Sequence, residues 1–235
     1  MSKKKHTIQS SDKNEFDEQV NKLLELGCEL LEGGYEVIKK KKKVIYSQVI
    51  VFKNCEVGFY ENGKLFYFKN INGDGEEDGL RTQWYENGNE SSEGTYKNGK
   101  DDGLYLSWYE NGQKKWEGTY KDGDLDGLWT WWYDNGRKKN QRTYKDGKQD
   151  GLWTWWYENG QKMSEITYND GKLDGLWIEW YENGQKYFEN TYKDGIRDGL
   201  HTGWYENGQK KFEWTYKDGK LIFKIEWNED GSVRK

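Results

Sequence analysis

The 235-residue sequence has no proline and no alanine, and only 33% of its residues are hydrophobic. An ordinary globular chain is roughly 45–50% apolar when glycine is counted, so a thick conventional core is not expected. Helical bundles are built from alanine, leucine and methionine, and they disfavour glycine. The absence of alanine beside 29 glycines therefore excludes a large helical bundle.

Long hydrophobic runs are also missing. The longest apolar stretch, Val44 to Phe52, is far shorter than the roughly 18 residues that a membrane-spanning helix needs. The first residues are basic, but polar residues follow where a signal peptide has its apolar segment. We therefore expect a cytoplasmic protein.

Cysteine is almost absent, because the chain contains only Cys28 and Cys55 and neither belongs to a CxxC motif. This usage favours two reduced, buried or half-buried thiols, with a disulfide or a redox pair as the alternative.

Aromatic residues are abundant by contrast, with 14 Trp, 18 Tyr and 8 Phe. Although 34% of the residues are charged, disordered chains lack such rings, each of which can bury a large area. The composition therefore predicts a folded, thin, aromatic β-protein.

The sequence repeats with a period of 24 residues. The triplet Asp-Gly-Leu keeps this step, as do Trp-Tyr-Glu/Asp-Asn-Gly and Thr-Tyr-Lys/Asn-Asp/Asn-Gly, and a fixed period is typical of repeat proteins. We predict an array over 58–221, with a degenerate first copy at 58–77 and six full repeats at 78–221, followed by a C-terminal capping strand at 222–235. The triplets begin at Asp78, Asp102, Asp126, Asp150, Asp174 and Asp198.

Each repeat carries two turn signals, Asn-Gly and Asp-Gly, both of which favour a type I′ hairpin turn. Two strands per repeat follow. The predicted fold class is an all-β repeat protein: an elongated, twisted antiparallel β-meander of 24-residue hairpin repeats with a short N-terminal α/β cap.

Two-residue loops at both turns would fix the strand register. They place Trp131 opposite Asn140 and Trp155 opposite Ser164, so that an aromatic ring faces a small or polar partner. Alternation then separates two faces. The "uniform face" carries the nearly unchanged Leu, Thr or Ile, Trp of Trp-Tyr, Glu and Thr columns, whereas the "variable face" carries the Tyr columns and the pairs that change from repeat to repeat.

Variation among copies of one repeat, where the backbone task is constant, indicates recognition. We therefore expect the aromatic centre of the variable face to bind a partner. The candidate residues are Trp129, Trp131, Trp153, Trp155, Trp177, Tyr133, Tyr157 and Tyr181.

Residues 1–57 differ from the array. Apolar residues from Asn14 to Leu31 fall close to helical spacing, which predicts an amphipathic helix ending at Gly33-Gly34. Residues 44–52 predict a strand. We interpret 1–57 as a helix-plus-strand cap that covers the open first edge of the sheet.

Signs of catalysis or metal binding are sparse. We interpret His201 as a surface residue, and the repeated Glu column as a ladder with neighbouring Lys or Thr. Asn70 to Gly75 matches the start of a calcium loop, but Arg81 stands at its twelfth position, where a bidentate Glu is required. We predict no enzyme activity, no metal and no cofactor.

The lysine run Lys39, Lys40, Lys41, Lys42 and Lys43 could contact anionic lipid. A net charge of −5 argues against nucleic acid as a partner, because an acidic array repels phosphate. A membrane-peripheral scaffold and a glycan or cell-wall binding module, with aromatic cages for choline, remain alternatives to a protein-binding scaffold.

The unit from Asp150 to Lys172 resembles the MORN-repeat variant of bacterial proteins in the YwqK-type antitoxin family. The resemblance covers roughly residues 58–221 and has no counterpart in 1–57. It implies an elongated β-meander, no catalytic residues, and an antitoxin or immunity role against a protein partner such as a basic toxin encoded nearby. An acidic, aromatic sheet face would suit such a partner.

Overall fold

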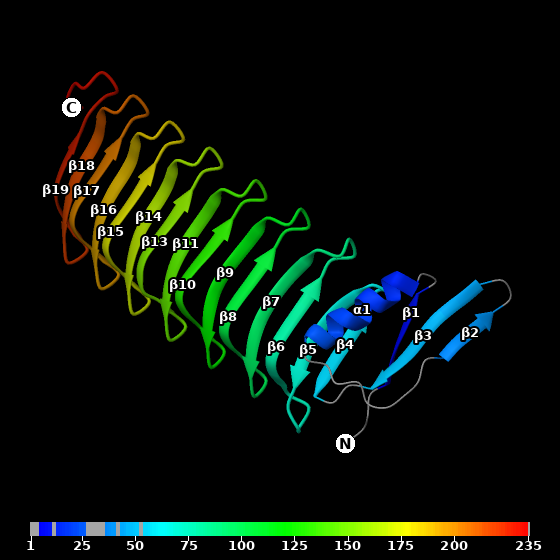
Figure 1. The fold of residues 1–235 in the computed structure, drawn as a ribbon. Coiled ribbons are helices and arrows are strands. Elements are labelled where there is room, and N and C mark those ends of the chain that lie inside the picture. The colour runs from blue at the N-terminus through cyan, green and yellow to red at the C-terminus, as the bar shows by residue number, and fades with distance from the viewer. Residues whose placement is uncertain (1–4, 11–12, 27–35, 41–42, 52–53, 235) are drawn as a thin grey trace. The chain divides into compact units, whose positions relative to one another are not determined.

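The computed structural model describes residues 5–10, 13–26, 36–40, 43–51 and 54–234, and it divides into two compact units, Met1–Gly112 and Gln113–Lys235. Within each unit, consecutive strands of the repeats pair antiparallel, which confirms the predicted all-β meander (Figure 1).

The first unit holds the helix and two sheets. One sheet has the order β1-β3-β2, and the other runs in chain order from β4 to β8. The elements are β1 (Lys5–Ser10), α1 (Lys13–Glu25), β2 (Glu36–Lys40), β3 (Lys43–Val51), β4 (Cys55–Phe59), β5 (Leu65–Ile71), β6 (Glu77–Trp84), β7 (Glu90–Lys97) and β8 (Lys100–Trp108).

The second unit is a meander in which each strand pairs with its neighbours in the chain, except that the short β12 pairs only with β11. The divergent C-terminal segment adds β19 and a bridge between Trp227 and Val233. The strands are β9 (Lys114–Lys121), β10 (Asp124–Trp132), β11 (Lys138–Lys145), β12 (Lys148–Gln149), β13 (Gly151–Trp156), β14 (Lys162–Asn169), β15 (Lys172–Trp180), β16 (Lys186–Lys193), β17 (Ile196–Trp204), β18 (Lys210–Lys217) and β19 (Lys220–Glu226).

The predicted register is confirmed: Trp131 pairs with Asn140 and Trp155 with Ser164. Gly203 pairs with Phe212 in the equivalent register, and a Cβ at Gly203 would lie 2.3 Å from the Phe212 ring. The glycine thus leaves the space that the facing ring occupies.

The two turns of each repeat differ, and the prediction is right for only one. In the Asp-Gly turns both residues have positive φ, as at Asp146 (47°) and Gly147 (76°), which type I′ requires. In the Asn-Gly turns only the glycine does, and Tyr157 N–H donates to Gln161 O across a three-residue loop. The loop is therefore longer than the predicted two-residue turn.

The asparagine explains this longer loop. Asn159 Oδ1 accepts a hydrogen bond from Gln161 N–H at 2.9 Å, an Asx turn that fixes the loop locally. Its Nδ2 donates to Glu182 O of the next repeat at 3.1 Å. One side chain therefore shapes its own turn and joins it to the neighbouring one.

Helix α1 ends at Glu25, short of the predicted boundary, and the rest of the predicted helix, from residue 27, lies outside the described residues. Gly27 follows directly in the sequence, and glycine is a weak helix former. The strand predicted at 44–52 is confirmed as β3, whereas β1 and β2 were not predicted.

Val20 and Leu23 of α1 pack in one core cluster with Val57, Leu65 and Phe68 of the first hairpin. The register aligns Leu65 and Phe68 with the Lys and Glu columns of the later repeats. The first copy is thus apolar where the later copies are charged, which explains why the helix packs here. It covers a face of β4 and β5, while β4 remains the terminal strand of its sheet among the described residues.

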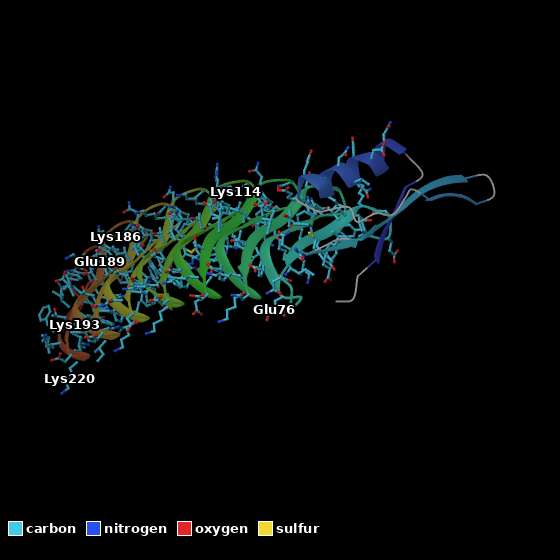
Figure 2. All side chains as sticks on the ribbon, turned by 60° about the horizontal axis from the view of Figure 1, so that its bottom comes forward. Glu76, Lys114, Lys186, Glu189, Lys193 and Lys220 are labelled. Carbon is cyan, nitrogen blue, oxygen red and sulfur yellow. The ribbon has the colours of Figure 1, made fainter. Side chains whose placement is uncertain are left out.

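On the uniform face of the later repeats, lysine, glutamate and tryptophan form a ladder. Lys186 Nζ lies 2.5 Å from a Glu189 carboxylate oxygen and 5.5 Å from the centre of the Trp204 ring, and the Lys186–Glu189 pair is labelled in Figure 2. The same Lys–Glu pairing occurs at Lys114–Glu117, Lys162–Glu165 and Lys210–Glu213. The predicted Glu ladder is confirmed, with lysine as the partner.

The core of the second unit lies on the variable face. Trp129 and Trp153 are 3% and 5% exposed and form a cluster with Tyr144, against which Trp131 and Trp155 pack. The leucines of the uniform face remain exposed, for example Leu152 at 49%. The interpretation of the variable face as a surface free for recognition is therefore wrong for its innermost rings.

Candidate protein-binding face

The variable face of the second unit brings the predicted tryptophans together at different depths. Trp129 and Trp153 are held by hydrogen bonds to the backbone, since their Nε1 atoms donate to Thr119 O at 3.1 Å and Thr143 O at 2.9 Å, respectively. Trp131 lies 5.7 Å from Trp129 between ring centres, and Trp155 lies 5.8 Å from Trp153. Two buried rings thus support two half-buried ones.

Trp177 belongs to the next repeat and is also half-buried. Its Nε1 donates to Glu179 Oε1 at 3.2 Å, and its ring meets Phe188 edge-on at 5.4 Å. Burial raises the pKa of Glu179, while the indole N–H partly opposes that rise. This part of the face therefore offers an aromatic ring beside a partly desolvated carboxyl group.

Arg142 also belongs to this face, although it was not among the residues predicted from the sequence to bind a partner. Its guanidinium lies 4.9, 5.1 and 5.5 Å from the ring centres of Trp131, Trp153 and Trp155. Such cation–π contacts hold an arginine in one orientation. A signal was present in the sequence, because Arg142 occupies a column that elsewhere holds Gly, Ile, Asn and Trp.

Arg142 also lacks a carboxylate partner. In the described part of the chain, no Asp or Glu oxygen lies within 4 Å of it, and its buried Nε has no hydrogen-bond partner. Two neighbouring buried atoms, Asn140 Oδ1 and Ser164 Oγ, are likewise unpaired among the described residues. Buried polar groups normally have hydrogen-bond partners. Water molecules or polar groups of a partner would therefore complete the hydrogen bonding of these three atoms.

The charges of this face differ from the expected acidic character. From β10 to β17 this face carries the ionisable side chains of Arg142, Glu179 and Arg197, and Lys139 Nζ lies 5.5 Å from the centre of the Tyr133 ring. The acidic residues lie mainly in the turns, such as the exposed Asp146 and Asp170, and on the uniform face. The aromatic centre is therefore locally cationic within an acidic chain.

The repeat geometry has a counterpart among known families. The model of the MORN repeat variant family matches residues 77–98, 101–122, 125–146, 149–170, 173–194 and 197–218, which together make up more than half of the chain. The chain belongs to this family. No curated protein matches it. MORN repeats generally form non-enzymatic scaffolds.

The tyrosines of the Trp-Tyr motif, expected to contact a partner, join the MORN repeats to one another. The hydroxyls of Tyr133, Tyr157 and Tyr181 donate to the backbone oxygens of Trp156, Trp180 and Trp204 of the next repeat, at 2.8–3.0 Å. Burial raises the pKa of all three phenols. These hydrogen bonds between repeats are sufficient to explain why a tyrosine recurs at this position, without contact with a partner protein.

His201 is not the surface residue that the sequence suggested, since it is 8% exposed. Its ring is surrounded by Phe188, Phe212, Trp214 and Tyr216 at 4.9–6.3 Å between centres. Burial, with a smaller effect of Arg197, lowers its pKa to about 4. The imidazole is therefore neutral at physiological pH and acts as an aromatic core residue.

The lysine run and the two cysteines belong to the first unit. Lys39 and Lys40 end β2 and Lys43 begins β3, whereas Lys41 and Lys42 lie outside the described residues. Cys55 is buried and accepts a weak hydrogen bond from Asn70 Nδ2 at 3.7 Å, and Cys28 also lies outside the described residues.

The calcium-like segment is a turn. Asn72 Oδ1 accepts hydrogen bonds from the N–H groups of Asp74 and Glu76, both at 3.0 Å. Across the described ranges, no group of three or more His, Cys, Asp or Glu side chains is placed to hold a metal ion, and no helix is long and apolar enough to cross a membrane.

Proposed function

We propose that this MORN-repeat chain is a protein-binding scaffold of the antitoxin or immunity type, and that it contacts its partner through Trp131, Trp155, Trp177 and Arg142 of the variable face. The backbone of the repeats is constant, so a residue that changes between repeats serves something other than the repeat itself. Tryptophan and arginine are the residues that most often dominate binding energy at protein interfaces.

The observation that carries the proposal is Arg142, which three indoles fix in place without a carboxylate partner among the described residues. The lysines of the uniform face illustrate the difference, because four of them pair with a Glu three residues along the chain. A partner that inserts an apolar group between Trp131 and Trp155 and presents a carboxylate to Arg142 would satisfy the site.

The overall charge of −5 acts at longer range. An acidic chain attracts a basic partner during the encounter, as would suit a toxin that itself binds nucleic acid, whereas the contact at Arg142 needs one acidic group. These requirements are compatible, because steering depends on the summed field and docking on local pairs.

The test is co-expression of the full chain with the products of the genes adjacent to its own, followed by pull-down and measurement of the dissociation constant. We expect Trp155→Ser to weaken binding of the captured product at least 30-fold, which corresponds to roughly 2 kcal/mol at an interface hot spot. Serine is compatible with this column, because Ser107 occupies the equivalent position. Leu152→Ser, on the exposed uniform face, is the matched control and should bind like the parent.

Two results would contradict the proposal. One is that no adjacent gene product binds the chain. The other is that Trp155→Ser and Leu152→Ser bind equally well, which would move the interface away from the variable face.

A further inference from the structure

A small cavity lies where α1 meets the first repeats, apart from the variable face. Its volume is about 280 Å³. Its walls include Gln19 and Lys22 of the helix, Lys64 just before β5, Leu65 in β5, Trp84 at the end of β6 and Asn87 in the turn that follows. The cavity mixes apolar walls with charged and amide groups, as binding sites for small molecules do.

Two polar atoms of this cavity's residues lack partners. Among the described residues, neither Gln19 Oε1 nor Trp84 Nε1 makes a hydrogen bond, although both atoms are buried and Trp84 is only 2% exposed. One is an acceptor and the other a donor. A buried unpaired donor and acceptor indicate that something not belonging to these residues, water or a ligand, completes the site.

The positive charge at the cavity is also incompletely balanced. Lys22 Nζ lies 4.4 Å from the centre of the Trp84 ring, and no carboxylate oxygen of the described residues lies within 4 Å of it. Burial lowers the pKa of Lys22, with Glu90 and Glu25 opposing the shift from further away. In several later repeats the lysine over the tryptophan also pairs with a Glu, as Lys162 over Trp180 does at 2.5 Å, although Lys138 over Trp156 has Gln141 at the Glu position.

Lys64 adds a second cation. Its Nζ donates to Glu86 O at 3.1 Å, and Lys64 is one of the residues that line the cavity. Among the described residues, Glu18 is the only carboxylate that lines the cavity. The two lysines leave the lining with one positive charge in excess.

We propose that this cavity binds a small carboxylate that carries a neighbouring N–H group, of the size of an N-acylated amino acid such as a peptide C-terminus. The carboxylate accepts hydrogen bonds from Lys22 Nζ and Trp84 Nε1, the N–H group donates to Gln19 Oε1, and the acyl group packs on Leu65. The assignment is independent of the partner-binding face, because it uses none of its residues.

The test is nuclear magnetic resonance of the full chain with ¹⁵N-labelled indoles, in which Trp84→Phe assigns the Trp84 Nε1–H signal. The probe is N-acetylglycine, and its matched control is N-acetylglycinamide, which has the same shape without the charge. We expect a saturable shift of the Trp84 signal with the acid and none with the amide. Lys22→Met keeps the apolar stem over Trp84 and should weaken the acid at least tenfold.

Three outcomes would overturn the proposal. The first is the absence of a saturable shift, and the second is an equal response to the acid and the amide or an unchanged response in Lys22→Met. The third is a marked upfield shift of the Trp84 indole proton in Gln19→Leu without any probe, because Gln19 and Trp84 would then already satisfy each other in the free chain.

Discussion

At the scale of single residues, burial separates side chains that the sequence alone groups together. Trp153 and Trp155 are two residues apart on the same face, yet Trp153 is 5% exposed and donates to Thr143 O, whereas Trp155 is only half-buried. The difference arises because Trp153 lies between Tyr144 and Tyr168, at 5.1 and 5.0 Å between ring centres. The structural role of Trp153 and the partner-binding role that we propose for Trp155 thus fall on the same strand.

This difference predicts unequal costs of substitution. Trp153→Ala should destabilise the chain by roughly 3–5 kcal/mol, as is usual for a buried aromatic residue. Trp155→Ser should cost clearly less, because its ring is already partly in water. Urea unfolding followed by circular dichroism measures both. Equal losses of unfolding free energy would show that Trp155 is also a core residue.

His201 predicts a dependence of stability on pH. Its folded pKa of about 4 lies below the ordinary value of 6.5, so the unfolded chain binds the proton more readily between these values. The contribution of the neutral imidazole is therefore complete above pH 6.5 and is lost as the pH falls towards 4. Unfolding free energies measured across this range should fall more steeply for the parent than for His201→Phe. Parallel pH profiles would contradict this prediction.

At the scale of elements, α1 covers apolar side chains of the β4–β5 hairpin that would otherwise be exposed to solvent. Val57 and Phe68 are 2% and 0% exposed beneath the helix, and Leu23 is 1% exposed above them. Lys22 supplies a cation over Trp84, the role that the array's own lysines play for the later tryptophans. In the first copy, helix α1 therefore takes the place of the Lys–Glu pairs that cover the uniform face in the later repeats.

Leu23→Asp tests this role of the helix. A charge in the centre of the cluster should detach α1 and expose Val57, Leu65 and Phe68, since a buried unpaired carboxylate is strongly unfavourable. We expect increased binding of a hydrophobic dye and earlier proteolysis near α1, with the later repeats still folded. Asn21→Asp, at an exposed position of the same helix, is the control. Unchanged dye binding in Leu23→Asp would show that α1 does not shield the cluster.

At the scale of the whole chain, each repeat combines contacts that recur from repeat to repeat with side chains that differ between repeats. The turns, the Asn and Tyr hydrogen bonds to the next repeat and the Lys–Glu pairs recur at equivalent positions in several repeats. The variable face carries residues that differ between repeats, with a cluster of tryptophans in repeats 126–173 and a histidine–aromatic cluster around His201. A repeat scaffold can thus change its recognition residues while its strand pairing stays constant.

The sequence by itself determined the period, the strand register and the separation of two faces, because these follow from turn residues and alternation, which are local. It also predicted β3 and the Glu ladder. Only the tertiary structure decided which face is the core: leucines on one face and tryptophans on the other are both apolar, and packing depth depends on neighbours one repeat away. The same reason explains why the sequence missed Arg142 among its three indoles, the buried state of His201, and Lys22 over Trp84. Each of these contacts joins residues from different strands or elements, which no local pattern records.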